Sequence, residues 1–228
     1  MSSRATEQAS PETIYRKYPS TPHLPWSPGA SADDVWVDTI AQFDGREVVV
    51  TEKMDGENTT MYRDHMHARS LDSRHHPSRS WVKALHSQIA HLIPAGWRVC
   101  GENLYARHSI AYEGLTSYFV VFSIWDERNV CLSWADTVEW AALLGLEVAP
   151  VLWSGVWDAR ALMRLADELD LTRQEGYVVR DADAFAFEDF TTHIAKWVRP
   201  DHVQTDQHWM HGPIIPNGLV SDDHAPAS

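Results

Sequence analysis

A polar turn that carries a lysine follows directly after an apolar run. The run EVVV (47–50) leads into TEKMDGENTT, in which Lys53 is followed by Asp55, Gly56 and Asn58. A lysine attacks phosphorus or a carbonyl carbon only when it is neutral, and at a reference pKa of about 10.4 that form is rare at pH 7. Burial or neighbouring cations must therefore lower the pKa of Lys53 if it does chemistry. Gly56 is expected to let the chain turn and lead back into the next strand as a hairpin, and a surface lysine beside such a turn would show the same pattern.

Four more charged residues lie at the ends of other apolar runs or interrupt them. Glu102 stands near the end of WRVCGEN, Glu175 precedes GYVVRD, and Lys196 and Arg199 fall in HIAKWVRP. Taken singly, such a charge more often protects a strand edge from aggregation. These residues follow Lys53 along the chain in a fixed order, and we therefore consider the five charged residues together.

This set resembles the nucleotidyltransferase motifs of the superfamily that contains polynucleotide ligases and mRNA capping enzymes. EKMDGEN is similar to motif I, ARS around Arg69 to the short basic motif that follows, GENLYARHSI to motif III, YFVVFSIWDE to motif IIIa, EGYVVR to motif IV and AKWVRP to motif V. Asn58 and the segment GENLY resemble ATP-dependent RNA ligases more than DNA ligases. The motifs span about two-thirds of the chain, and KYPSTPHLPWSP (17–28) resembles an element that closes over the nucleotide.

The resemblance implies a reaction. Lys53 would attack the α-phosphate of ATP, expel pyrophosphate and carry AMP, which would pass to an RNA 5′-phosphate before a 3′-hydroxyl seals the strand. Glu175 would help to hold Mg²⁺ or Mn²⁺, and such a cation would both neutralise the triphosphate and favour neutral Lys53.

The resemblance also implies which residues bind the nucleotide. Arg69 would hold its ribose or phosphate, Glu102 a ribose hydroxyl and Lys196 the α-phosphate. Phe122, or a neighbour in its strand, would stack on adenine. RNA ligases often carry two lysines in motif V, so the second basic role here falls to Arg199 or is absent. The full set implied for cofactor binding is Glu52, Asp55, Gly56, Asn58, Arg69, Glu102, Phe122, Lys196 and Arg199.

Short β-type runs alternate with helical patterns between two polar ends. Strands are expected at 47–52, 59–63, 66–70, 97–103, 117–125, 129–134, 176–181 and 193–199. Helices are expected at 80–94, 135–145 and 158–170, with Ser80 as an N-cap, Gly145 closing the second helix and Asp158 opening the third. The pattern predicts an α+β fold of mostly antiparallel sheets flanked by helices. The resemblance implies a nucleotidyltransferase (ATP-grasp-like ligase adenylation) domain.

The chain ends differ in composition from the part between them. We expect a disordered segment at 1–12, the adenylyltransferase domain at 13–211 and a tail at 212–228. Because about 28 residues follow Pro200, we expect no C-terminal OB domain.

Charge and composition limit the partners. A net charge of −13 argues against broad phosphate-backbone binding, so RNA contact must be local or must depend on a repair partner protein. Basic residues concentrate at 63–86, where the histidines 65, 67, 75 and 76 lack the spacing of a structural zinc site. The absence of a signal peptide or an apolar membrane span predicts a cytoplasmic protein that binds no membrane. Cys100 and Cys131 are expected to be reduced core residues.

Other functions remain open at the level of sequence. A DNA ligase, a GTP-dependent capping-type nucleotidyltransferase and a non-catalytic nucleotide- or RNA-binding module all fit parts of the pattern. The sequence also leaves open the RNA substrate, which could be a nick, a single-strand break or a tRNA fragment, and the choice between Mg²⁺ and Mn²⁺.

Overall fold

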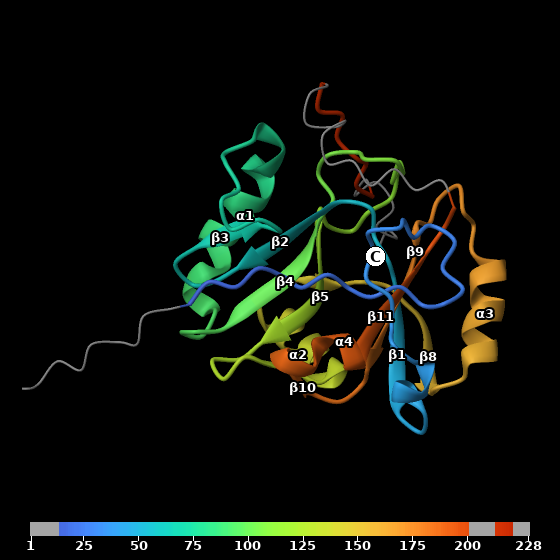
Figure 1. The fold of residues 1–228 in the computed structure, drawn as a ribbon. Helices are drawn as coiled ribbons and strands as arrows, with labels where there is room; N and C mark the ends of the chain where they lie inside the picture. The colour runs from blue at the N-terminus through green and yellow to red at the C-terminus, as the bar shows by residue number, and fades with distance from the viewer. Residues whose placement is uncertain (1–13, 201–212, 221–228) are drawn as a thin grey trace, which may run out of the picture.

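Two antiparallel sheets form the centre of the protein (Figure 1). The structure is a computed structural model and describes residues 14–200 and 213–220, so the predicted disorder at 1–12 and the predicted boundary at 211 fall outside the described residues. The smaller sheet has the strand order β11-β9-β1-β8. Its strands are β1 (Glu47–Glu52), β8 (Val151–Val156), β9 (Gly176–Asp181) and β11 (Ile194–Val198). Because β1 pairs with neighbours on both sides and is buried, it is a continuous apolar run rather than an alternating one.

The larger sheet contains the rest of the expected strands and two short strands, β7 and β10, that were not expected. Its order is β10-β6-β5-β4-β2-β3, with β7 pairing parallel to β5. Its strands are β2 (Glu57–Met61), β3 (Met66–Ala68), β4 (Arg98–Asn103), β5 (Phe119–Trp125), β6 (Val130–Cys131), β7 (Glu147–Val148) and β10 (Phe185–Ala186).

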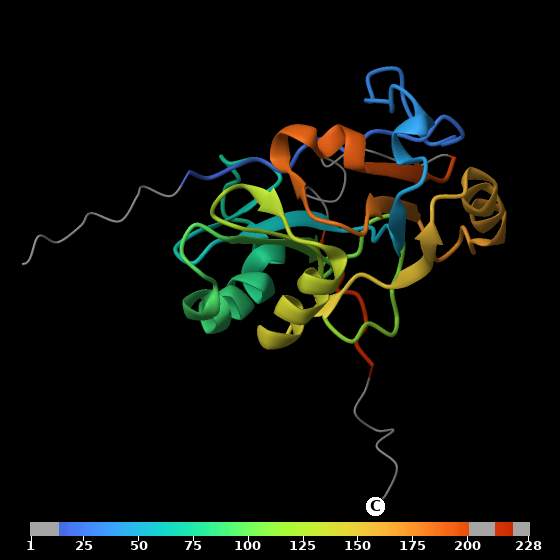
Figure 2. The ribbon, with the colours of Figure 1, turned by 90° about the horizontal axis from the view of Figure 1, so that it is seen from below.

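Helices pack against both sheets. Helices α1 (Ser80–Ile89) and α2 (Trp134–Leu143) share a core with one face of the larger sheet, while the short α4 (Phe190–His193) packs on its other face (Figure 2). Helix α3 (Ala159–Glu168) buries Leu162 and Ala166 against the smaller sheet. The remaining helical turns are 3-10 segments at Ile40–Phe43, Pro77–Arg79, Ala90–Leu92 and Phe187–Asp189. The predicted α+β class is confirmed.

The prediction of a hairpin after Lys53 is wrong. β1 pairs with β8 and β9, whereas β2 pairs with β3 and β4, so residues 53–56 carry the chain from one sheet to the other. Gly56 is needed there because a Cβ at this position would lie 2.6 Å from the carbonyl oxygen of Asn103. The glycine therefore permits a close approach of two chain segments instead of a tight turn.

Several boundaries also differ from the predictions. Strand β8 was not expected, because it is an edge strand with mixed burial and contains Gly155. The N-cap of α1 is Arg79 rather than Ser80, since a 3-10 turn leads directly into the helix. Asp158 does cap α3, accepting hydrogen bonds from the backbone of residues 160 and 161, and Gly145 follows α2 with a φ of 68°.

Two further expectations concern the cysteines and membrane spans. Cys100 and Cys131 are buried and free, as predicted. Within residues 14–200 and 213–220, no helix has the length and apolar character needed to cross a membrane.

Candidate active site

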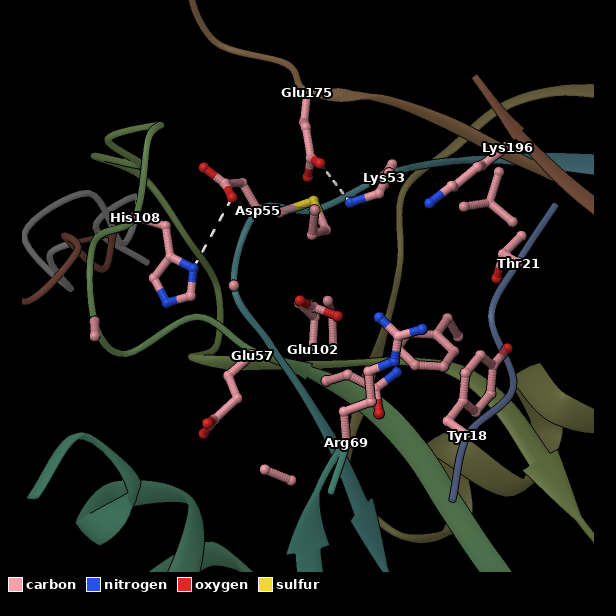
Figure 3. A pocket seen from close by; sticks show the side chains of 18 of the residues that line it. Tyr18, Thr21, Lys53, Asp55, Glu57, Arg69, Glu102, His108, Glu175 and Lys196 are labelled. Carbon is pink, nitrogen blue, oxygen red and sulfur yellow. Dashed lines mark hydrogen bonds and ion pairs between the residues drawn. The ribbon is translucent and has the colours of Figure 1, made fainter. Parts of the chain in front are cut away.

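A cavity of about 1200 Å³ lies between the two sheets, beside the segment that connects them. Strands β1, β9 and β11 line it from one side and β2, β3, β4 and β5 from the other. The structure brings nearly all of the predicted site residues to this cavity (Figure 3). The predicted residues that line it are Glu52, Lys53, Asp55, Gly56, Asn58, Arg69, Glu102, Phe122, Glu175 and Lys196.

Lys53 and Glu175 meet where β1 ends and β9 begins. The backbone N–H of Lys53 donates to the carbonyl of Gly176 at 2.9 Å, which extends the pairing of the two strands by one residue. Lys53 Nζ lies 2.5 Å from Glu175 Oε1, and the Glu175 side chain is fully buried while that of Lys53 is 25% exposed. Burial lowers the pKa of Lys53, but the charges of Glu175, Glu102 and Asp55 outweigh it and raise that pKa.

The sign of this pKa shift corrects an expectation. The protein's own groups do not lower the pKa of Lys53; they keep the lysine charged and held against Glu175. A group that binds the carboxylates, or that brings positive charge, is needed to release the lysine from this ion pair.

Lys196 enters the same cavity from β11, beside Lys53 (Figure 3). Burial and then the charge of Lys53 lower the pKa of Lys196 to about 8, although Asp34 and Glu175 act in the opposite direction. β11 can pack this closely on β9 because Gly176 has no side chain; a Cβ there would lie 2.0 Å from the carbonyl oxygen of Trp197.

Glu102 faces the two lysines from the larger sheet. It pairs with Asn58 across β4 and β2, and it lies below Lys53 in Figure 3. Burial raises the pKa of Glu102 to about 8; Lys53 lowers it, and the carboxylates of Glu175 and Asp55 raise it further. The Oδ1 atom of Asn58 is buried and has no hydrogen-bond partner among the described residues, as expected for an acceptor held ready for a ligand.

Asp55 turns away from the lysines. Its Oδ2 accepts hydrogen bonds from Ser109 Oγ at 2.6 Å and from the backbone N–H of Ile110 at 2.8 Å. Its own backbone N–H donates to the hydroxyl of Tyr112 at 2.9 Å. Asp55 therefore ties the connecting segment to residues 109–112, and the structure gives it an anchoring position at the edge of the cavity rather than a carboxylate aimed at its centre.

The aromatic residues Phe122 and Tyr18 line the same cavity as Arg69, together with the chain segment at residues 18–21. Phe122 lies in an edge-to-face contact with Tyr18, with ring centroids 5.1 Å apart. Arg69 donates to Ser20 Oγ at 2.7 Å, and residues 18–21, which are part of the 17–28 element, line the cavity. Glu52 accepts a hydrogen bond from Gln174 at the rim.

Arg199 is the predicted site residue that does not line the cavity. Its guanidinium donates to the carbonyl of Leu171 at 2.6 Å and to Ser109 Oγ at 3.3 Å. It tethers two loops, so its predicted contact with the nucleotide has no support in this geometry.

Sequence reasoning missed one end of the cavity. Residues 72–76 and 106–109 extend it beyond Glu57, which forms a two-point ion pair with Arg79. The signals in the sequence were the basic run at 63–86 and the segment GENLYARHSI, which contains residues 106–109. They indicated the charges but could not indicate that both segments form this end of the cavity.

The comparisons with known proteins bear on the same residues. Residues 46–198, which include every motif from Lys53 to Lys196, match the sequence profile of the RNA ligase family. This chain belongs to the RNA ligase family. No curated protein matches it.

Solved structures show the fold of this family member. An archaeal ATP-dependent RNA ligase is 16% identical with a TM-score of 0.54, and the match covers 81% of this chain and 48% of that one. A mutant RNA ligase of Naegleria gruberi, solved with AMP and manganese, is 18% identical with a TM-score of 0.50, covering 71% of this chain and 52% of that one. The chain thus spans about half the length of the structures it matches. The predicted nucleotidyltransferase fold is confirmed.

The donor set around Lys53 fits a divalent cation that is bound together with a nucleotide. Within the described residues, no three His, Cys, Asp or Glu side chains gather into a metal cage. Mg²⁺ does not need one, because it usually takes one or two carboxylates and completes its shell with phosphate oxygens and water. Glu175 supplies such a carboxylate next to the lysine, and Glu102 supplies a second across the cavity.

Proposed function

We propose that this protein is an ATP-dependent RNA ligase that joins RNA 5′-phosphate and 3′-hydroxyl ends through AMP carried on Lys53. The observation that supports this most is the position of Lys53, which directly follows β1. It contacts the buried Glu175 and shares a cavity with Glu102 and Lys196. A lysine among two carboxylates and a second cation has what attack on a triphosphate needs: a nucleophile, oxygen ligands for a cation and positive charge for the phosphates.

The first step forms the covalent intermediate. Lys53 Nζ attacks the α-phosphorus of ATP, so that a nitrogen–phosphorus bond forms while the bond to the β-phosphate oxygen breaks and pyrophosphate leaves. Lys196 stabilises the negative charge that builds on the α-phosphate. A divalent cation, when bound, would supply further charge neutralisation for the triphosphate.

Glu175 has a double role in this proposal. In the ligand-free protein it holds Lys53 in the charged form. A cation bound to its oxygens would weaken this ion pair and so lower the pKa of the lysine. The same carboxylate therefore keeps Lys53 charged in the ligand-free protein and would let it lose its proton when a cation is bound with ATP.

The remaining residues position the nucleotide. Phe122 offers an aromatic face for adenine, Glu102 an acceptor for a ribose hydroxyl, and Asn58 its unsatisfied carbonyl oxygen. Arg69, which donates to Ser20 and lines the same cavity as Phe122, binds ribose or phosphate.

The later steps use RNA. A 5′-phosphate oxygen of RNA attacks the phosphorus of lysyl-AMP, which breaks the nitrogen–phosphorus bond, frees Lys53 and forms RNA-adenylate. A 3′-hydroxyl then attacks the RNA 5′-phosphorus, and AMP leaves as the phosphodiester forms.

The RNA end enters, on this proposal, through the part of the cavity beyond Glu57. A cavity of about 1200 Å³ is larger than the roughly 300–1,000 Å³ typical of small-molecule sites, which leaves room for a second substrate. Arg74, His75 and Arg107 line that end, whereas the chain as a whole is acidic. Phosphate contacts are therefore local, and a repair partner protein would strengthen RNA binding in the cytoplasm.

A strand-joining assay tests the proposal. RNA with 5′-phosphate and 3′-hydroxyl ends, incubated with ATP and Mg²⁺ or Mn²⁺, is expected to give RNA-adenylate and then joined RNA. Nicked duplexes, single strands and cleaved tRNA serve as separate substrates. Joining of nicked DNA but of no RNA, or a requirement for GTP or NAD in place of ATP, would contradict it.

A further inference from the structure

The segment at residues 213–220, here called the C-terminal strap, packs against the loop at residues 104–118, here called the anchor loop (Figure 1). Isolated bridges join Ala106 to Pro216 and Leu115 to Leu219. Backbone hydrogen bonds add to them, from Arg107 to the carbonyl of residue 215 at 2.8 Å and from Gly218 to that of residue 112 at 2.7 Å. The first residues of the strap, 213–215, themselves line the cavity that contains Lys53.

Asn217 is the residue of the C-terminal strap that is buried against the anchor loop, with 4% of its surface exposed. Its Nδ2 donates to the carbonyl of Leu104 at 2.8 Å, and its Oδ1 accepts from the backbone N–H of Tyr112 at 3.0 Å. Its backbone N–H donates to Tyr105 and its carbonyl accepts from the Tyr118 hydroxyl. A buried amide with every group engaged at four places along one loop organises that loop, because each lost bond would leave a buried polar group unsatisfied.

The anchor loop in turn holds the segment that carries Lys53. Tyr112 accepts the backbone N–H of Asp55, and Ser109 and Ile110 donate to the Asp55 carboxylate. Residues 104–118 contain no helix and no named strand. Their conformation therefore depends on tethers such as Asn217 rather than on a continuous ladder of backbone hydrogen bonds.

These contacts make a continuous path from the strap to the nucleophile. Asn217 holds the backbone of Tyr112, the Tyr112 hydroxyl holds the backbone of Asp55, and Asp55 is two residues from Lys53. On the opposite side Lys53 is fixed by its backbone bond to Gly176. A displacement of about 1 Å at a reacting group can slow a reaction about a hundredfold, so a tether of this kind bears on rate as well as on stability.

We propose that Asn217 is a positioning residue for Lys53, and that the C-terminal strap is a working part of the active site that sets the conformation of the anchor loop. The expected effect of Asn217 on the rate of AMP attachment rests on the proposed function. The path of hydrogen bonds from Asn217 to Asp55 does not depend on that function.

Point variants of the full chain test the effect on rate. Single-turnover attachment of AMP is measured at saturating ATP for Asn217→Ala and Tyr112→Phe, for the double variant and for Ile89→Val. Ile89 is the last residue of α1, is buried in the core and does not line the cavity, so Ile89→Val loses stability without touching the path. All rates are measured below the melting temperature of every variant.

The expected result is a rate at least tenfold lower for Asn217→Ala, with the ATP concentration for half-maximal rate changed less than threefold. Tyr112→Phe is expected to slow the step as well. The double variant is expected to be about as slow as the slower single variant, because both act through Asp55. A wild-type rate in Asn217→Ala would overturn the proposal. A double variant whose loss in rate is the product of the two single losses would also overturn it.

Hydrogen exchange supplies a measurement that does not depend on activity. In Asn217→Ala, amides of residues 104–118 and of residues 53–56 should exchange faster, while those of α1 should not change. In Ile89→Val, the amides of α1 should exchange faster, while those of residues 104–118 and 53–56 should not change. Unchanged exchange at residues 53–56 in Asn217→Ala would refute the path even if wild-type protein accepted no AMP, an outcome that would refute the proposed function separately.

Discussion

Glu102→Gln is expected to stabilise the ligand-free protein at alkaline pH while weakening its use of ATP. Burial raises the pKa of Glu102 from its ordinary value of 4.5 to about 8. Between these two values the folded protein holds a proton on Glu102 that the unfolded chain has released. Stability from this group is therefore greatest below pH 4.5 and is lost as the pH rises toward 8.

The size of the effect follows from that difference. Each tenfold change in proton affinity is worth about 1.36 kcal/mol, which sets an upper limit of about 5 kcal/mol. The Glu102 side chain is partly exposed. Solvent therefore screens part of the penalty, and we expect about 2 kcal/mol in favour of Glu102→Gln at pH 8.5. At pH 5 the difference should be near zero, since glutamine resembles the protonated acid.

The assay is urea unfolding of both proteins at pH 5, 7 and 8.5 with chelator and without nucleotide. Glu139→Gln, an exposed position on α2, is the matched control and should change little at any pH. At pH 8.5, where Glu102 is ionised, the same variant should bind ATP less well, because it loses a charged acceptor for the ribose. A stability difference that does not grow with pH, or a less stable Glu102→Gln at pH 8.5, would refute the reasoning.

Further predictions concern packing and substrate. Gly101→Ala should lower the free energy of unfolding by about 3 kcal/mol in urea titrations, since its Cβ would lie 2.4 Å from the ring of Phe119. Lys196→Met should slow single-turnover AMP attachment about a hundredfold, yet stabilise the ligand-free protein at pH 7, because it removes a partly buried cation whose pKa is lowered to about 8. Arg74→Ala with Arg107→Ala should weaken transfer of AMP to RNA much more than its attachment to the protein; equal losses in both steps would place these arginines in the ATP site instead.

The convergence of Lys53, Glu102, Glu175 and Lys196 could be predicted from the sequence. Each stands at or near the end of an apolar run, and such ends meet at the rim of a sheet. Their order along the chain then matched one set of motifs. The continuous apolar runs around them also made the central strands the most reliable part of the fold prediction.

Local patterns could not show which strand pairs with which. A glycine after a strand suits a hairpin and a crossing between sheets equally well, so the path from β1 to β2 was predicted wrongly. Asp55 and Arg199 were assigned by motif, but their hydrogen bonds to Ser109 depend on a loop 54 and 90 residues away in the sequence. The strap had the composition of a tail, and nothing local distinguishes Asn217 from an exposed asparagine.

The central claim is that Lys53 carries AMP, and mapping the attached nucleotide tests it most directly. Protein incubated with ATP labelled at the α-phosphate and with Mg²⁺ or Mn²⁺ is denatured, digested and analysed by peptide mass. The account predicts one AMP on the peptide that contains Lys53, no label in Lys53→Met, and full label in Lys83→Met, which changes an exposed lysine of α1. Label on Lys196, or equal label in Lys53→Met, would contradict it.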